Sequence, residues 1–256
     1  MKFLIALQFL TIIPVKIKKH FGEREIAQSM FFYPFAGIII GLILAGSYYL
    51  AYPYLNSFAA SVIVVAILAV LTGGLHLDGL TDTADALFSN KNGEEKLRIM
   101  KSSHIGAMGA AALTISILLK VSLINALPQK SALFAIILMP AAGRCSLLIP
   151  ALLFRYAREE EGTGSFIKSL GLGTVLPAVI ITVLISTVML QLPGLCSIII
   201  AFVISVLLGK FIAIKIGGMT GDTLGAINEV CEVIFIGTIC VLEGGMLCGI
   251  SLLCLF

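Results

Sequence analysis

Three aspartates recur at helical spacing in the segment 73–87, GGLHLDGLTDTADAL. Asp78, Asp82 and Asp85 occupy positions i, i+4 and i+7, which fall within about 60° of one another around a helix. Like charges at this spacing repel, so the stripe costs stability unless a cation neutralises it. Mg²⁺ prefers oxygen ligands and usually keeps waters or phosphate oxygens. The spacing therefore favours a magnesium site over a solvated helix face, which would mix lysine with acid.

A second acidic segment, GGMTGDTLGAINE at 217–229, repeats this pattern. Both segments contain two glycines, three further residues and an aspartate, and both place another carboxylate seven residues later. We expect the two helix starts to meet at one membrane surface, where facing carboxylates could hold two metal ions for phosphoryl transfer. The match is too short to separate a parallel repeat from convergence. The predicted metal ligands are Asp78, Asp82, Asp85, Asp222 and Glu229.

Basic residues that could hold phosphate oxygens lie near both acidic segments. They are Arg98, Lys101 and His104 in LRIMKSSHIG, and Arg155 and Arg158 further along the chain. Arg144 lies inside an apolar stretch, where a charge is expensive and marks a functional site by default. Its alternative role is a structural pair with a buried acid or with backbone carbonyls. His76 could bind a metal or a phosphate, or could simply be hydrogen-bonded.

Few of the 256 residues are charged: 12%, while 59% are hydrophobic. Soluble domains have about 45–50% apolar and 25% charged residues, and the mean hydropathy here is +1.09. So few charges cannot cover a water-soluble protein of this size. We therefore expect an all-α, polytopic integral membrane bundle that forms a single domain over 1–256. The net charge of +3, with no basic run, argues against nucleic-acid binding.

Seven stretches are long and apolar enough to span a bilayer, which takes about 20 residues. They are 33–54, 58–77, 105–127, 131–154, 171–191, 194–216 and 233–255. Residues 1–15 are too short to span and contain Pro14, so a re-entrant or interfacial helix is expected there.

The charged residues gather on one side of these spans. Most of the 17 basic residues fall in the segments 16–30, 78–104 and 155–168, or at the end of the sixth span. The positive-inside rule makes this side cytoplasmic in a multi-pass protein of the plasma or inner membrane. All of the 14 acidic residues except Glu243 lie on the same side. Because acids contribute little to topology, their segregation indicates an active site at the cytoplasmic face.

Four runs of residues together resemble the cobalamin synthase family of membrane adenosylcobinamide-GDP ribazoletransferases. The runs are GGLHLDGLTDTADAL, LRIMKSSHIGAMGA, the stretch from Arg144 to FRYAREEEGTG, and GGMTGDTLGAINE. The resemblance extends along the whole chain, including FLTIIPV near the N-terminus and the segment 32–37. The chain departs from the family pattern at Ala86, Ser102 and His104, where glycine, aspartate and arginine are frequent.

The resemblance implies a phosphoryl transfer in which a ribose hydroxyl of α-ribazole, or of its 5′-phosphate, attacks adenosylcobinamide-GDP. GMP leaves, and adenosylcobalamin or its 5′-phosphate forms in the final step of lower-ligand assembly. Mg²⁺ on the five acids would neutralise the pyrophosphate, and Asp82 would accept the hydroxyl proton. The expected substrate contacts are His76, Arg98, Lys101, His104, Arg144, Arg158, Thr220 and Asn228. The lipid bilayer is the other expected partner, and the sequence leaves open whether the protein forms a homo-oligomer.

Other classes of protein remain alternatives from the residues alone. A CDP-alcohol phosphotransferase also uses metal-bound aspartates, and Asp82 and Asp85 fit its motif. Ala86, however, stands where that motif requires glycine, and the continuation of the motif is missing. A membrane prenyltransferase would need an Asn-Asp-x-x-Asp cluster, which is absent. A cation transporter could use intramembrane charges such as Lys120 and Glu243, but acids gathered at one surface leave little for an outer gate.

Overall fold

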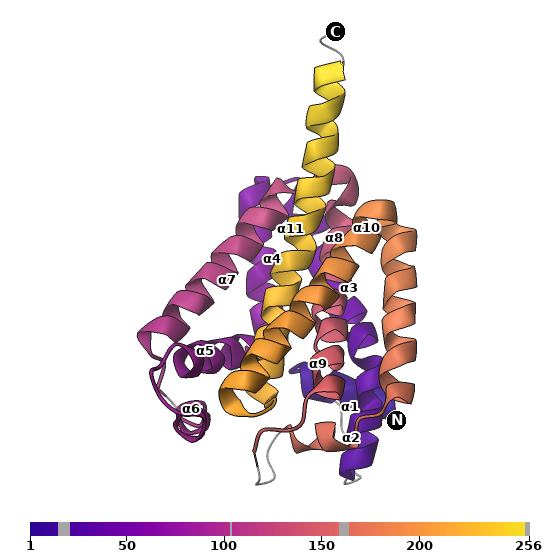
Figure 1. Ribbon diagram of the computed structural model, residues 1–256. Coiled ribbons are helices and arrows are strands. Elements are labelled where there is room, and N and C mark those ends of the chain that lie inside the picture. The colour runs from indigo at the N-terminus through magenta and orange to yellow at the C-terminus, as the bar shows by residue number, and fades with distance from the viewer. Residues whose placement is uncertain (15–20, 103, 159–163, 254–256) are drawn as a thin grey trace.

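The computed structural model describes residues 1–14, 21–102, 104–158 and 164–253, with side chains described as far as Gly244. Within these ranges the backbone is helical, and its only β-type pairing is one isolated bridge. The prediction of an all-α membrane bundle is confirmed. Figure 1 shows the long helices packed side by side, with the short helices near the N-terminus gathered at one end.

The helices are bounded as follows. In chain order they are α1 (Lys2–Leu10), α2 (Glu23–Ser29), η1 (Met30–Phe32), α3 (Tyr33–Ala51), α4 (Ser57–Leu71), α5 (Leu75–Leu87), α6 (Gly93–Ile99), α7 (Ala107–Ala126), α8 (Gln129–Ser146), α9 (Leu148–Leu153), η2 (Ser165–Ser169), α10 (Leu172–Ile216) and α11 (Gly221–Leu253), where η1 and η2 are 3₁₀ helices.

The protein crosses the membrane several times. In the described part of the chain, five helical segments are long and apolar enough to span, or six if α4 and α5 count as one broken span. The difference from the seven predicted spans lies mainly in α10, which runs through both 171–191 and 194–216. Gln191 interrupts α10 with φ 53° and ψ −138°, close to Pro193, which lacks a backbone donor. Figure 1 shows the second half of α10 returning beside the first.

The predicted span 58–77 ends early, at a sharp break between α4 and α5. Gly73 and Gly74 adopt φ values of 60° and 71°, in the left-handed region that glycine enters without steric penalty. Helix α5 consequently leaves α4 at 88°. It lies across the bundle (Figure 1), so the acidic stripe does not continue along the axis of α4.

Helix α11 begins twelve residues before the predicted span at 233–255. Thr220 and Thr223 stabilise this early start: the Thr223 N–H donates to Thr220 Oγ1 at 3.2 Å, and the Thr220 N–H donates to Thr223 Oγ1 at 2.8 Å. Such side-chain partners satisfy the free N–H groups at a helix start. Glu229 therefore lies in the body of a long helix rather than in a surface loop.

The short N-terminal helix α1 is fastened to the bundle. Nine residues cover only about 13 Å, so α1 is too short to cross a bilayer. The Phe9 ring stacks on Tyr33 with a 6.0 Å centroid separation, and the Ile12 N–H donates to the Leu71 carbonyl at 2.9 Å. These contacts place α1 beside α3 and the end of α4, close to the break that redirects α5.

Candidate active site

Helix α5 crosses the start of α11 at very short range. A Cβ atom added to Gly79 would lie 2.5 Å from the Asp222 carbonyl oxygen, and the Gly225 backbone faces His76 and Gly79 across the same contact. Side chains larger than hydrogen would hold the two helices apart. The pair of glycines therefore brings the aspartates of α5 close to Asp222, as the repeated sequence pattern predicts.

The acidic cluster consists of Asp78, Asp82 and Asp85 on α5 and Asp222 on α11. Partial burial, followed by the charges of Asp78, Asp222 and Asp85, raises the pKa of Asp82 to about 6. Both causes disfavour the ionised carboxylate, burial more than the neighbouring charges. The acids also repel one another, and a bound cation would relieve that repulsion.

Asp85 has a second role that the sequence pattern did not predict. Its carboxylate accepts hydrogen bonds from the N–H groups of Gly106 at 2.6 Å and Gly109 at 2.8 Å. It thereby caps the N-terminus of α7, where free N–H groups and the helix dipole favour an anion. A Cβ atom on Gly106 would lie 2.5 Å from an Asp85 oxygen, so the glycines of GAMG leave room for the carboxylate.

Arg158 connects the acidic cluster to the next loop. Its Nη2 atom lies 3.0 Å from Asp222 Oδ2, with both side chains mostly buried. Backbone pairing holds the loop in place: the Ala157 N–H donates to the Met219 carbonyl at 2.9 Å, and the Met219 N–H donates to the Arg155 carbonyl at 2.8 Å. The predicted neighbours Arg158 and Asp222 are therefore in direct contact.

A wide basic groove of about 920 Å³ lies next to this ion pair. Its charged lining comprises Arg98, Lys101, Arg158 and Lys215, with Glu94 as the acid. Three of these cations were predicted as phosphate contacts, and the structure brings them together. Lys215 was not predicted as a site residue, although it lies only two residues before the Gly217-Gly218 pair. His104 is exposed and does not line the groove.

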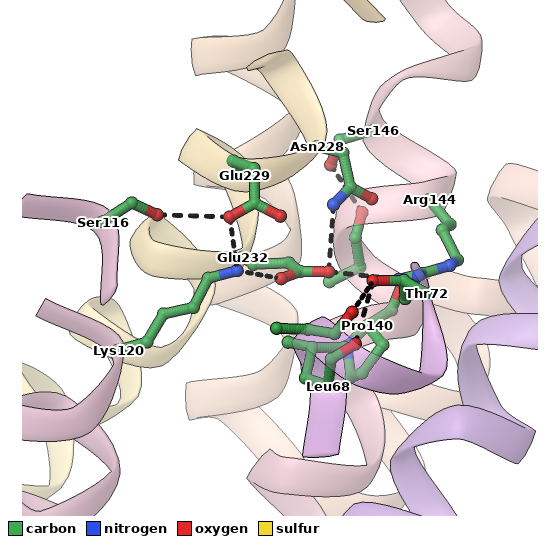
Figure 2. Close-up of polar contacts among 12 residues, drawn as sticks. Leu68, Thr72, Ser116, Lys120, Pro140, Arg144, Ser146, Asn228, Glu229 and Glu232 are labelled. Carbon is green, nitrogen blue, oxygen red and sulfur yellow. Dashed lines mark hydrogen bonds and ion pairs between the residues drawn. The ribbon is translucent and has the colours of Figure 1, made fainter. Parts of the chain in front are cut away.

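Glu229 lies in a buried polar network instead of the acidic cluster (Figure 2). Lys120 Nζ lies 2.7 Å from a Glu229 oxygen and 2.5 Å from a Glu232 oxygen. Ser116 also donates to Glu229, at 3.2 Å. Seven residues of helix place Glu229 about 10 Å deeper than Asp222. The structure thus places the predicted metal ligand Glu229 apart from the acidic cluster, where its carboxylate pairs with Lys120 inside the bundle.

Arg144 belongs to the same network and not to the phosphate contacts. It is completely buried, and its Nη1 atom lies 3.1 Å from Glu232 Oε1 and donates to the Pro140 carbonyl. Asn228 Nδ2 donates to the same Glu232 oxygen at 3.0 Å (Figure 2). Of the two roles considered for Arg144, the structure supports the structural pair with a buried acid.

Two further residues expected to contact substrate also have partners within the protein. Asn228 and Thr220 are both completely buried; Asn228 is bound to Glu232, and the Thr220 hydroxyl caps α11. Glu232, which the sequence did not single out, is the residue that joins Lys120, Arg144 and Asn228. Its position three residues after Glu229, on the same helix face, is the signal that could have identified it.

A mainly apolar cavity of about 300 Å³ lies next to the acidic cluster. Asp78, Asp222 and the buried His76 are its polar lining residues, together with Tyr33. The predicted site residue His76 thus lies beside the two carboxylates, on a buried face of α5. The acidic cluster thus borders the basic groove through the Arg158–Asp222 contact and the apolar cavity through Asp78 and Asp222.

The carboxylate oxygens of the cluster fit an Mg²⁺ ion that takes only some of its ligands from the protein. Within the described ranges, no group of three or more His, Cys, Asp or Glu side chains is arranged to hold a metal by itself. Mg²⁺ is commonly bound by one or two carboxylates and completes its octahedron with water and substrate phosphates. Asp78, Asp82 and Asp222 supply such carboxylates, and burial together with the neighbouring acids raises the pKa of Asp82.

Comparison with known proteins gives one consistent result. A family model described as cobalamin-5-phosphate synthase matches residues 2–240. The adenosylcobinamide-GDP ribazoletransferase of Desulforamulus reducens is 40% identical over 228 residues, which cover 89% of this chain and 91% of the relative. Relatives with the same name from Acetivibrio thermocellus and Clostridium botulinum are 36% and 38% identical, and cover 92% and 91% of this chain and 95% of each relative. No solved structure matches the chain.

Proposed function

The chain belongs to the cobalamin-5-phosphate synthase family, and we propose that it transfers the adenosylcobinamide phosphoryl group from GMP to α-ribazole or its 5′-phosphate. The observation that supports this proposal is the acidic cluster between α5 and α11, bordered by the basic groove. A pyrophosphate ester needs both features, because its transfer requires neutralised phosphate oxygens and a placed nucleophile.

In the proposed reaction, a ribose hydroxyl oxygen forms a bond to the phosphorus nearer the corrinoid. The bond from that phosphorus to the bridging oxygen of the pyrophosphate breaks, and GMP leaves with the bridging oxygen. Asp82 accepts the hydroxyl proton, since a carboxylate with a raised pKa is a better base than an ordinary aspartate. Bound Mg²⁺ would supply charge neutralisation at the pyrophosphate oxygens.

The basic groove holds the guanosine diphosphate part of the substrate in this proposal. Arg98 and Lys101 on one wall and Lys215 on the other give the groove its positive charge. Arg158 lines the groove and also contacts Asp222, so it can orient a phosphate directly beside the acidic cluster. Every role is filled by one chain, and the proposal does not require a homo-oligomer.

We also propose that this end of the bundle faces the cytoplasm of the plasma or inner membrane. The positive-inside rule supports this orientation, because basic residues are concentrated in the connections at the α5 end. A cytoplasmic site would meet nucleotide substrates directly.

Purified protein in detergent or nanodiscs provides the test of the function. Incubation with adenosylcobinamide-GDP, α-ribazole and Mg²⁺ should release GMP and form the cobalamin product in equal amounts. Chelation of the metal should stop both. If GMP is not released, or is released equally without α-ribazole, the proposed transfer is wrong.

A further inference from the structure

The apolar cavity beside the acidic cluster has flat, aromatic walls. Phe9 stacks on Tyr33 with ring planes 16° apart, and Phe166 meets Phe9 edge to face with a centroid separation of 5.6 Å. Leu10, Met30, Leu147 and Leu224 complete much of the apolar lining. These residues come from α1, η1, α8–α9, η2 and α11, so the tertiary fold builds the cavity.

The size and charge of the cavity restrict what it can hold. Its volume of about 300 Å³ lies at the lower end of small-molecule sites, which range over about 300–1,000 Å³. A corrin ring with its side chains is several times too large. A guanosine diphosphate group would bring its negative charge next to Asp78 and Asp222, while the basic groove lies nearby. A small, uncharged aromatic group suits the cavity best.

Tyr33 supplies a polar group inside these apolar walls. Its side chain is 2% exposed, and its hydroxyl has no hydrogen-bond partner among the described residues. A buried hydroxyl without a partner costs roughly 1–3 kcal/mol, so such groups usually meet a ligand or water. A ligand with one hydrogen-bond acceptor on a planar apolar ring would satisfy it.

We propose that this cavity binds the benzimidazole base of α-ribazole, with the Tyr33 hydroxyl donating to the ring nitrogen that carries no ribose. The inference rests on the proposed function and assigns the second substrate, α-ribazole, to this cavity. The ribose then lies at the rim formed by Asp78 and Asp222, next to Asp82. The corrinoid substrate then approaches the acidic cluster from the groove, and the nucleoside approaches it from the cavity.

Steady-state kinetics with both substrates varied separately test this assignment. Phe166→Ala should raise the KM for α-ribazole by roughly 3- to 10-fold, the range expected for losing one aromatic contact, and leave the KM for adenosylcobinamide-GDP within twofold. Phe134→Ala is the matched control, because Phe134 is 43% exposed on α8 and does not line the cavity; both KM values should stay unchanged.

Tyr33→Phe tests the hydrogen bond with little risk to folding. The KM for α-ribazole should rise roughly 2- to 10-fold, whereas an indole riboside, which lacks the acceptor nitrogen, should show no difference between the wild type and Tyr33→Phe. This loss of sensitivity is the signature of a direct contact. An unchanged KM for α-ribazole in both variants, or a rise in the KM for adenosylcobinamide-GDP alone, would overturn the assignment.

Direct binding separates this inference from the proposed function. Equilibrium dialysis of radiolabelled α-ribazole against the protein, without corrinoid or metal, should give binding that Phe166→Ala weakens and Phe134→Ala does not. If the wild type releases no GMP but this binding pattern holds, the proposed function fails and the cavity assignment stands. If the wild type releases GMP and the binding is insensitive to Phe166→Ala, only the cavity assignment fails.

Discussion

Arg158 Nη2 lies 3.0 Å from Asp222 Oδ2, at the border between the basic groove and the acidic cluster. A guanidinium in this position can keep one edge on the carboxylate and offer the other to a phosphate. We expect Arg158→Lys to keep less than about a tenth of the wild-type kcat/KM for adenosylcobinamide-GDP, because lysine cannot make the forked contact. Lys91→Arg, at an exposed site outside the groove, is the control; activity equal to wild type in Arg158→Lys would contradict this role.

Asp82→Asn should reduce GMP release by at least 100-fold, since the loss of a general base typically costs 10²–10⁴ in rate. The side chain is only partly buried and the amide has the same shape, so the thermal unfolding midpoint should stay close to that of the wild type. Glu95→Gln, an equivalent change in the capping box of α6, should remain active. If Asp82→Asn retains most of the activity, Asp82 is not the base.

Magnesium binding should weaken as the pH falls through about 6. The pKa of Asp82 is raised to about 6 by burial and by its acidic neighbours, so below that pH a proton occupies the carboxyl and competes with the metal. Titrations with Mn²⁺ as a spectroscopic substitute, from pH 5 to pH 8, measure this competition. Affinity that stays constant over this range would show that Asp82 does not bind the metal.

Lys120→Met should lower the free energy of unfolding by about 3–5 kcal/mol, because it leaves Glu229 buried without a cation and leaves Glu232 with Arg144 alone. Combining it with Glu229→Gln should recover part of that loss, as measured by thermal unfolding in detergent. Glu229→Gln alone should leave the Mg²⁺ concentration for half-maximal activity unchanged, whereas Asp78→Asn should raise it at least about tenfold. An equal rise in both variants would restore Glu229 as a metal ligand.

Gly79→Ala should both destabilise the contact between α5 and α11 and reduce activity. The new Cβ would lie 2.5 Å from the Asp222 carbonyl, and such overpacking costs about 1–3 kcal/mol. Gly46→Ala, where a Cβ meets nothing within 4 Å, should be neutral or slightly stabilising. A fully active and stable Gly79→Ala would mean that the two helices can separate without disturbing the acids.

The helical spacing of the acids in the site could be predicted from sequence, whereas the depth at which Glu229 lies in the bundle could not. The spacing of Asp78, Asp82 and Asp85 correctly predicts a helix, and the repeated glycine pattern correctly brings Asp222 to it. The predicted span at 233–255 leaves out the first twelve residues of α11, because their mixed polarity sets them apart from the apolar stretch that follows. Thr220 and Thr223, three residues apart, mark that start.

The partners of Arg144 and Glu229 lay beyond any local pattern. Lys120 and Glu229 are 109 residues apart in the chain, and only tertiary packing reveals that their charges cancel inside the bundle. The sequence left Arg144 with two possible roles, since an intramembrane charge can serve a substrate or a buried acid equally well. In the structure Arg144 Nη1 lies 3.1 Å from Glu232 Oε1, which is the pairing with a buried acid that one of these roles requires.

The pairing of Lys120 with Glu229 and Glu232 also sets an order for biogenesis. The ribosome delivers α7 and α8 to the translocon before either glutamate has been synthesised, so Lys120 and Arg144 enter the membrane unneutralised, each at an insertion cost of roughly 2.5–3.5 kcal/mol. Only the arrival of α11 balances them. A nascent chain that stops before α11 therefore retains two buried cations without the carboxylates that neutralise them.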